Sequence, residues 1–325
     1  MTYNKSLQGR FVGSVTPVVV MFAASLVLWI TGAVLGTGSA TPTLLSLAGV
    51  NFVGDFFARF LSLLAFLSVA LVLNHLYLFE RRVHWLSPLF MWLSAVCMFA
   101  HVDYLSSISS LFLVLSIAQL LSCVQETGQE RSIYGAFALL SFSSLFLLQF
   151  LCLLPLFVAY LFIARISRVK NMLAALLGAV TPWWLLLGMV YVFPSLDTLL
   201  LPARMCYENI VTGAEISYTA LPLVIAGVEV LALVVAVGCF VVSSLPAKPL
   251  LRRRLLFIML LNTYLLLLSF ALPQDYMMFL VWRLPGLAIL VSYTLSMRVT
   301  KLSNFYFIFL NIVWLFIAGL CLWIG

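Results

Sequence analysis

Charged residues beside apolar stretches are the residues of this chain that could do chemistry. Asp55 and Arg59 stand four positions apart, one helical turn, at the start of an apolar stretch, where they could form an ion pair. His101 and Asp103 lie together between two other apolar stretches. Carboxylates in such places act as general bases or metal ligands, and arginines grip phosphate or pyrophosphate. We therefore predict catalytic roles for Asp55 and Asp103 and substrate-binding roles for Arg59 and His101.

Three further charged residues belong to this predicted substrate-binding set. Asp275 begins a later apolar stretch, Arg283 lies about two helical turns deeper in it, and Arg204 stands in a loop expected on the same side. An unpaired charge at the depth of Arg283 is costly, so it needs Asp275, Asp55 or a lipid head group as a partner. We predict that Arg283 faces the protein interior. The alternative is that these residues only anchor helix ends and form local ion pairs.

Glu229 is the one acid inside an apolar stretch. Acids in that position mark ion or proton paths, or are protonated and hydrogen-bonded inside a helix bundle. Both interpretations predict a buried side chain with a polar neighbour. Asn262, Asn74 and His75 are the candidate neighbours by residue type.

Motifs of soluble enzymes and of metal sites are absent from the sequence. It has no phosphate-binding glycine-rich loop, no Cys-x-x-Cys and no His-Glu-x-x-His. The six cysteines are scattered without metal-ligand spacing, and Cys206 alone falls in a predicted external loop. We predict no cofactor, no metal and no disulfide framework.

The composition is that of a membrane protein. Of 325 residues, 65% are hydrophobic and only 8% are charged, well outside the range of soluble domains. A net charge of +7 would suggest nucleic acid in a soluble protein, but in a membrane protein basic residues mark cytoplasmic loops. We predict an all-α, polytopic transmembrane bundle that forms a single domain over residues 1–325 and binds no nucleic acid.

Eleven apolar stretches are predicted to be membrane helices. They are Val15–Leu35, Phe56–Leu78, Leu86–Val102, Tyr104–Val124, Tyr134–Leu148, Leu151–Ala164, Met172–Phe193, Ala220–Val242, Leu255–Leu272, Tyr276–Ser296 and Phe305–Ile324. As one helix, the stretch Tyr134–Ala164 would reach roughly 46 Å, too long for a bilayer without steep tilt. Gln149 and Pro155 instead predict a break between two short helices that meet near the outer surface.

The distribution of basic residues orients these helices. With eleven spans and the amino terminus in the cytoplasm, fourteen of the 17 basic residues lie inside, and only Arg59, Arg204 and Arg283 lie outside. Merging the two short helices would place two basic loops, 165–170 and 248–254, on the outer side. The run 11–35 exceeds the core of a signal peptide, so it is predicted to be an uncleaved first span. The carboxy terminus is therefore predicted outside.

Three segments resemble an uncharacterised family of polytopic inner-membrane proteins from Bacteroidota. They are Tyr134-Gly135-Ala136 through Pro155, then Asn171-Met172 to Leu177-Gly178-Ala179-Val180-Thr181-Pro182, and Leu284-Pro285-Gly286-Leu287-Ala288-Ile289-Leu290. The resemblance covers most of the chain through mostly apolar motifs. It implies a multi-pass protein of a bacterial inner membrane and carries no activity with it.

More remotely, the layout resembles glycosyltransferases of the C type, which use lipid-linked sugars. Those enzymes combine short paired helices with an acidic first external loop, and they act on polyprenyl-phosphate sugars at the outer face. Asp55 would be the matching acid. This chain departs from the pattern because Asp55 lies at the end of its loop and the frequent paired-acid motif is missing.

Three classes of function stay open on the sequence alone. The first expectation is binding or processing of a lipid-linked saccharide or anionic lipid at the outer face, in which case an enzyme would be glycosyltransferase-like. The second is a non-enzymatic membrane subunit with a cell-envelope protein as partner. The third is a transporter of a small solute or of protons, for which a polar path through Glu229 would be evidence.

Overall fold

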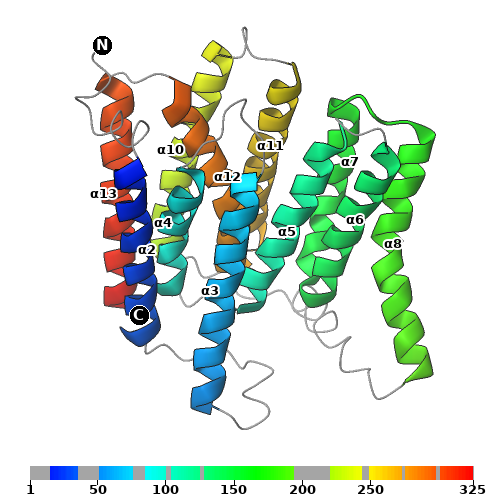
Figure 1. Ribbon diagram of the computed structural model, residues 1–325, viewed down its shortest axis with the longest axis horizontal. Helices are drawn as coiled ribbons and strands as arrows, with labels where there is room; N and C mark the ends of the chain where they lie inside the picture. The colour runs from blue at the N-terminus through cyan, green and yellow to red at the C-terminus, as the bar shows by residue number, and fades with distance from the viewer. Residues whose placement is uncertain are drawn as a thin grey trace. The chain divides into compact units, whose positions relative to one another are not determined.

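A computed structural model describes residues 15–35, 51–75, 85–99, 104–124, 128–193, 220–243, 249–272, 275–297 and 301–324. In these ranges all regular structure is helical, with eleven α-helices, one 3-10 helix and no strand. The α-helices are α2 (Val15–Leu35), α3 (Asn51–His75), α4 (Leu86–Phe99), α5 (Tyr104–Ser122), α6 (Gln129–Phe146), α7 (Leu154–Ile163), α8 (Val169–Val192), α10 (Ala220–Ser243), α11 (Pro249–Ala271), α12 (Tyr276–Met297) and α13 (Lys301–Ile324). The predicted all-α class is therefore confirmed for the described residues (Figure 1).

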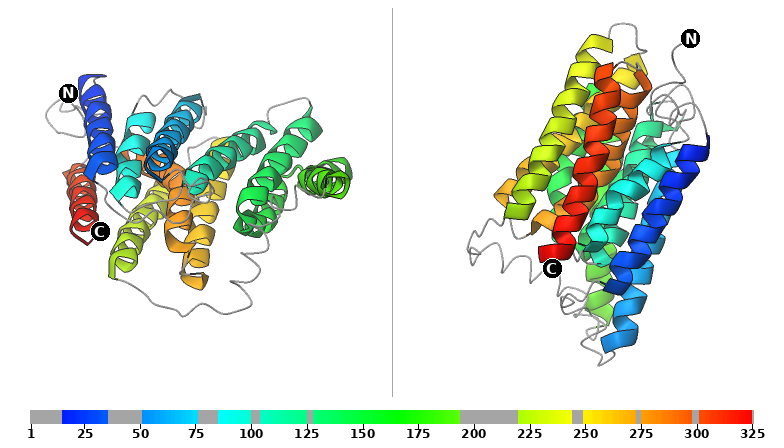
Figure 2. Two further views of the ribbon diagram at one scale, coloured as in Figure 1. Left: turned by 90° about the horizontal axis from the view of Figure 1, so that it is seen from below. Right: turned by 90° about the vertical axis from the view of Figure 1, so that its left-hand side faces the viewer.

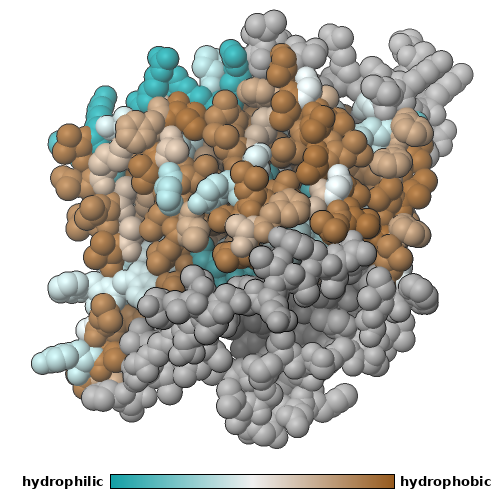
Figure 3. Space-filling view, turned by 180° about the vertical axis from the view of Figure 1, so that it is seen from behind, coloured by the Kyte–Doolittle hydropathy of each residue, from teal (hydrophilic) through white to brown (hydrophobic). Residues whose placement is uncertain are grey.

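Five of the helices are long and apolar enough to cross a membrane. These candidate spans are Val169–Val192, Pro222–Val241, Pro249–Ala271, Tyr276–Ser296 and Ser303–Leu320. Large apolar side chains also cover the outer surfaces of the spans of α8, α10, α11 and α13, and Trp184 of α8 is 74% exposed. The face drawn in Figure 3 is correspondingly brown along the helices. Such a surface suits hydrocarbon rather than water.

The break predicted between α6 and α7 is confirmed. Helix α6 ends at Phe146, and Leu147 is extended, with φ −138° and ψ 103°. A 3-10 helix, η2 (Leu148–Leu153), follows, and α7 begins with Pro155 in its first turn. Proline lacks a backbone N–H, and the first turn of a helix is where that N–H is not needed.

Helices α6 and α8 run in the same direction. The Asn171 side-chain amide of α8 donates to Gln129 of α6 at 3.4 Å, and further along both helices the Trp183 indole donates to Ser144 at 2.9 Å. Residues near the start of α6 bond residues near the start of α8, and residues near the end of α6 bond residues further along α8. The two helices are therefore parallel, and η2 and α7, which connect them, must run in the opposite direction. Their six and ten residues span about 27 Å, close to the thickness of the hydrocarbon core.

The turn after α7 is a Schellman motif without glycine. Ile166 N–H donates to the carbonyl of Leu161, and Arg165 N–H donates to that of Phe162. Arg165 takes a left-handed conformation, with φ 59°, at the position that glycine usually fills. Arginine therefore stands where glycine would be less strained.

Two compact units emerge from the helix contacts. One comprises residues 108–216, with most of α5, then α6, η2, α7 and α8. The other comprises residues 1–107 and 217–325, with α2, α3, α4 and α10 to α13. In the second unit, Trp29 of α2 donates to Ser94 of α4 at 3.3 Å, and Trp314 of α13 donates to the Leu93 carbonyl at 2.9 Å. Indole groups from α2 and α13 thus hold α4, and the backbones of all three helices lie near one another in Figure 2.

Helix α12 forms the centre of this second unit. It packs against α4, α10, α11 and α13, and the end-on view in Figure 2 shows it beside α4, α10 and α11. Every residue from Met278 to Leu295 is buried. A charged side chain on such a helix is shielded from water, so a partner on a neighbouring helix must stabilise it.

Candidate functional site

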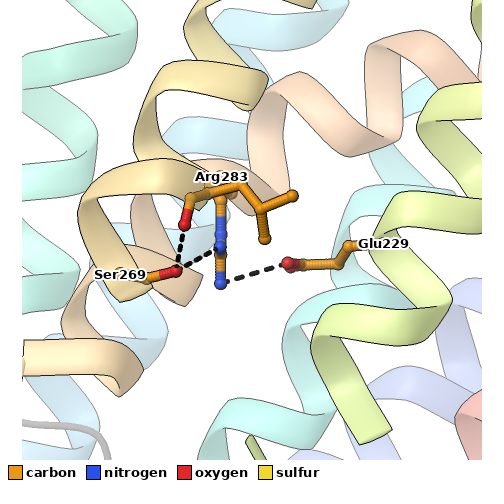
Figure 4. A network of polar contacts seen from close by, with 4 residues as sticks. Glu229, Ser269 and Arg283 are labelled. Atoms are coloured by element: carbon orange, nitrogen blue, oxygen red, sulfur yellow. Dashed lines mark hydrogen bonds and ion pairs between the residues drawn. The ribbon is translucent and has the colours of Figure 1, made fainter. Parts of the chain in front are cut away.

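A buried ion pair between α10 and α12 is the principal polar feature of the second unit. Arg283 Nη2 on α12 lies 3.1 Å from Glu229 Oε2 on α10. The two side chains are only 2% and 5% exposed. Figure 4 shows both pointing into the space between their helices. Each charge therefore lowers the cost of burying the other.

Both residues lie in the first half of their helices. Arg283 follows the start of α12 by about 10 Å of helix rise, and Glu229 follows the start of α10 by about 14 Å. At these depths both side chains lie about two helical turns or more inside the ends of their helices. Hydration from the helix ends therefore contributes little to stabilising the two charges.

A serine and a tyrosine fix the guanidinium of Arg283. Arg283 Nη1 donates to Ser269 Oγ of α11 at 2.9 Å, and Ser269 Oγ donates to the Leu266 carbonyl at 2.7 Å (Figure 4). The guanidinium carbon also lies 5.2 Å from the centre of the Tyr276 ring, within cation–π range. Arg283 is thus held by α11 and by its own helix independently of Glu229.

Hydrogen bonding at this cluster is incomplete. Arg283 Nε and Nη2, the Tyr276 hydroxyl and both Glu229 carboxylate oxygens are buried without a hydrogen bond. The 3.1 Å approach of Glu229 to Arg283 is therefore a contact between charges rather than a bidentate fork. Buried polar groups nearly always find hydrogen-bond partners. The unused donors around Arg283 can therefore bond another acceptor, such as a ligand oxygen.

About one helical turn after Arg283 on α12, this helix approaches α11 closely at Gly286. The Asn262 side chain of α11 occupies the space that a Cβ atom at Gly286 would need, and its amide donates to the Ile258 carbonyl at 2.9 Å. Asn262 was a candidate neighbour of Glu229 by residue type. The structure instead packs it against Gly286.

The two buried charges were predicted separately, and the structure brings them together. The expectations that Glu229 is buried with a polar neighbour and that Arg283 faces the interior are confirmed. The acid found beside Arg283 is Glu229, whereas Asp275 and Asp55 were the predicted partners and the side chain of Asp55 lies outside the described residues. Asp275 lies directly before α12 and is half-buried. The sequence did carry one signal of this pair, because the two opposite charges lie at similar depths in their apolar stretches.

The remaining predicted site residues lie outside the described side chains. Asp55 and Arg59 are in the first turns of α3, but only its backbone is described there. His101, Asp103 and Arg204 fall outside the described ranges, as does the side chain of His75; Asn74 is exposed on α3. Within the ranges given above, no three His, Cys, Asp or Glu side chains are grouped to hold a metal ion. The catalytic roles of Asp55 and Asp103 stay predictions.

No protein-family model, curated protein or solved structure matches this chain. The candidate site is therefore interpreted from its own geometry.

Proposed function

We propose that this protein is a multi-pass protein of a bacterial inner membrane that binds the phosphate of an anionic lipid or of a lipid-linked saccharide at Arg283. The observation that supports this proposal is the set of buried donors without acceptors, namely Arg283 Nε, Arg283 Nη2 and the Tyr276 hydroxyl. Arginine favours phosphate because its planar fork matches two phosphate oxygens. The Tyr276 hydroxyl can donate to a third.

The position of the pair favours a lipid ligand over a solute held at the surface. Arg283 lies about 10 Å along a helix buried on every side, within the depth of acyl chains and glycerol backbones rather than of bulk water. A lipid can place its phosphate at that depth because its acyl chains favour the apolar surroundings. A free phosphate ion would have to lose all of its hydration to bind there. Catalysis on a bound saccharide by Asp55 and Asp103, as in the C-type glycosyltransferases that the layout resembles, would extend this proposal.

The outer leaflet is the proposed source of the lipid, because α12 begins on the outer side in the eleven-span topology. Support for an odd number of spans comes from the parallel α6 and α8, which require a return of the chain through η2 and α7. The positive-inside rule then places the amino terminus in the cytoplasm and the carboxy terminus outside.

A reporter that is active only in the cytoplasm tests this topology. Fused after Gly325, it is expected to be silent, whereas the same reporter fused within the basic loop after α7, at Arg168, is expected to be active. Whole-cell reporter activity, normalised to protein abundance, is the measurement. Strong activity at Gly325 would contradict the odd span count.

Substitution of Arg283 by lysine tests the phosphate site. Lysine keeps the charge but loses the bidentate fork, so we expect folding to be preserved and retention of phosphatidylglycerol to fall about tenfold. The matched control is Arg252→Lys, at an exposed arginine of α11. Native mass spectrometry of the purified protein measures lipid retention, with phosphatidylglycerol, a polyprenyl-phosphate sugar and inorganic phosphate as separate probes.

Each probe distinguishes a source of the phosphate. If Arg283→Lys loses retention of the polyprenyl-phosphate sugar alone, the ligand is a lipid-linked saccharide. If it loses retention of both lipids, the site binds anionic lipids in general. Competition by inorganic phosphate would indicate that the ligand is a free anion. Equal lipid retention by the Arg283 variant and its control would leave only a structural ion pair.

Transport of a small solute or of protons is the second candidate function. It is favoured by buried polar residues that continue from the ion pair along one face of α11, where Ser269, Asn262 and Arg254 are each less than 10% exposed. Their spacing of seven and eight residues keeps them on one side of the helix. Uptake by proteoliposomes that depends on Glu229 would favour transport over lipid binding.

A further inference from the structure

We propose that Glu229 is an internal competitor for the phosphate site, so that an anionic head group binds to Arg283 only as Glu229 releases it and takes up a proton. This inference rests on the proposed phosphate site at Arg283 and adds how that site is regulated. It is drawn from the geometry of the pair, in which a carboxylate already occupies one side of the guanidinium.

Charge balance requires the proton. In the ligand-free state the guanidinium and the carboxylate sum to zero. If a phosphodiester entered while Glu229 stayed ionised, the buried cluster would carry one uncompensated negative charge, which is strongly unfavourable in a low-dielectric interior. If one proton enters with the phosphodiester, Glu229 becomes a neutral acid and the phosphate takes its place beside Arg283. The cluster is then neutral before and after binding.

The contacts of Arg283 allow this exchange without moving the arginine. Ser269 of α11 holds Nη1, and the Tyr276 ring lies against the guanidinium from within α12. Glu229 comes from a third helix, α10, and makes no hydrogen bond that would have to break. The carboxylate can therefore turn away while Nε and Nη2 stay in place for the incoming oxygens. Once protonated, Glu229 gains an O–H that can itself donate to the phosphate.

The other titratable groups near α10 include one further acid. Helix α12 contributes Arg283 and Tyr276 at the site, and Asp275 stands directly before this helix; α13 contributes Tyr306, and α11 contributes Tyr264 and, further along, Arg254. Tyrosine and arginine side chains keep their protons between about pH 5 and 7.5. We assign a proton taken up on lipid binding in this range to Glu229, and the Glu229→Gln variant separates its contribution from that of Asp275.

Affinity for phosphatidylglycerol as a function of pH tests the exchange. The head group is a phosphodiester whose charge is constant over this range, so any pH dependence belongs to the protein. We expect affinity to rise by up to about tenfold for each unit fall in pH, because the complex holds one more proton than the free protein. Glu229→Gln, which mimics the protonated acid, is expected to bind at least as tightly and with no pH dependence. Glu130→Gln, at an exposed glutamate of α6, is the matched control and should keep the wild-type slope.

Proton uptake by the wild-type protein provides a second measurement that needs no variant. Calorimetric titration with the same lipid in two buffers of different ionisation enthalpy is expected to show uptake of up to one proton per lipid bound. If no proton is taken up, or if the lipid affinity of Glu229→Gln depends on pH as strongly as that of the wild type, the exchange between Glu229 and phosphate is overturned. The proposed phosphate site at Arg283 would not be affected by either result. Absence of lipid binding by every variant at every pH would overturn the phosphate site itself.

Discussion

Replacing Arg283 by methionine is expected to lower the free energy of unfolding by about 3–5 kcal/mol, because the substitution leaves the Glu229 carboxylate buried without its opposite charge. The loss should shrink as pH falls, since protonation neutralises the isolated carboxyl group. Unfolding of the purified protein in mixed micelles, followed by tryptophan fluorescence, measures the change. Arg252→Met, at an exposed position of α11, is the matched control and is expected to change stability by no more than about 0.5 kcal/mol.

Adding Glu229→Leu to Arg283→Met is expected to restore most of the lost stability. A buried ion pair that is replaced as a whole by apolar side chains is often neutral or stabilising, since the desolvation of both charges is avoided. The double variant should therefore unfold within about 1 kcal/mol of the wild type and yet lose the retained lipid. A double variant as unstable as the sum of its single changes would mean that each side chain is needed for other reasons, and a purely structural role would then be favoured.

The stability of the fold alone does not explain why an ion pair, rather than two apolar residues, stands at positions 229 and 283. An apolar pair could fill the same space between α10 and α12 at no greater cost, so the charges are best explained by a task that needs them. Ser269 and Tyr276 support this explanation, since they position Arg283 without satisfying all of its donors.

The helical architecture could be predicted because hydrophobic length has a direct physical meaning in a membrane. Every predicted span has a helix at its position, and Val15–Leu35 agrees at both ends. The helix ends were less predictable. Helix α11 begins at Pro249 rather than at the predicted Leu255, since the basic turn at 252–254 continues the helix beyond its apolar stretch. Hydropathy locates the part of a helix in hydrocarbon, whereas hydrogen bonding determines where the helix begins.

The pairing of Glu229 with Arg283 could not be predicted in the same way. Each residue could be assigned to the bundle interior from the cost of burying its charge. Which helices are neighbours, however, depends on packing between segments more than fifty residues apart in sequence. The acids nearest to Arg283 in the chain or at the same predicted surface, Asp275 and Asp55, were therefore chosen instead. The close contact between Asn262 of α11 and Gly286 of α12 could not be predicted for the same reason.

A second large effect is expected at Gly178 of α8, where α6 and α8 meet. A Cβ atom added at Gly178 would lie 2.5 Å from the Tyr134 carbonyl oxygen and 3.0 Å from the Phe137 Cβ atom. Neither atom belongs to the flexible end of a side chain, so the two helices must move apart. We expect Gly178→Ala to lower the free energy of unfolding by about 1–3 kcal/mol, as overpacking does elsewhere. The midpoint of thermal unfolding in detergent, followed by size-exclusion chromatography, measures the effect.

Gly188 of the same helix supplies the matched control. An added Cβ atom there meets nothing within 4 Å, so Gly188→Ala is expected to be neutral or to stabilise α8 by up to about 1 kcal/mol through its higher helix propensity. The two alanine substitutions have the same chemistry and differ only in what surrounds them. Equal effects at the two positions would mean that α6 and α8 do not pack through Gly178. The parallel pairing would then rest on the Asn171–Gln129 and Trp183–Ser144 hydrogen bonds alone, and the proposed outer location of Arg283, which depends on the return of the chain through η2 and α7, would be weakened.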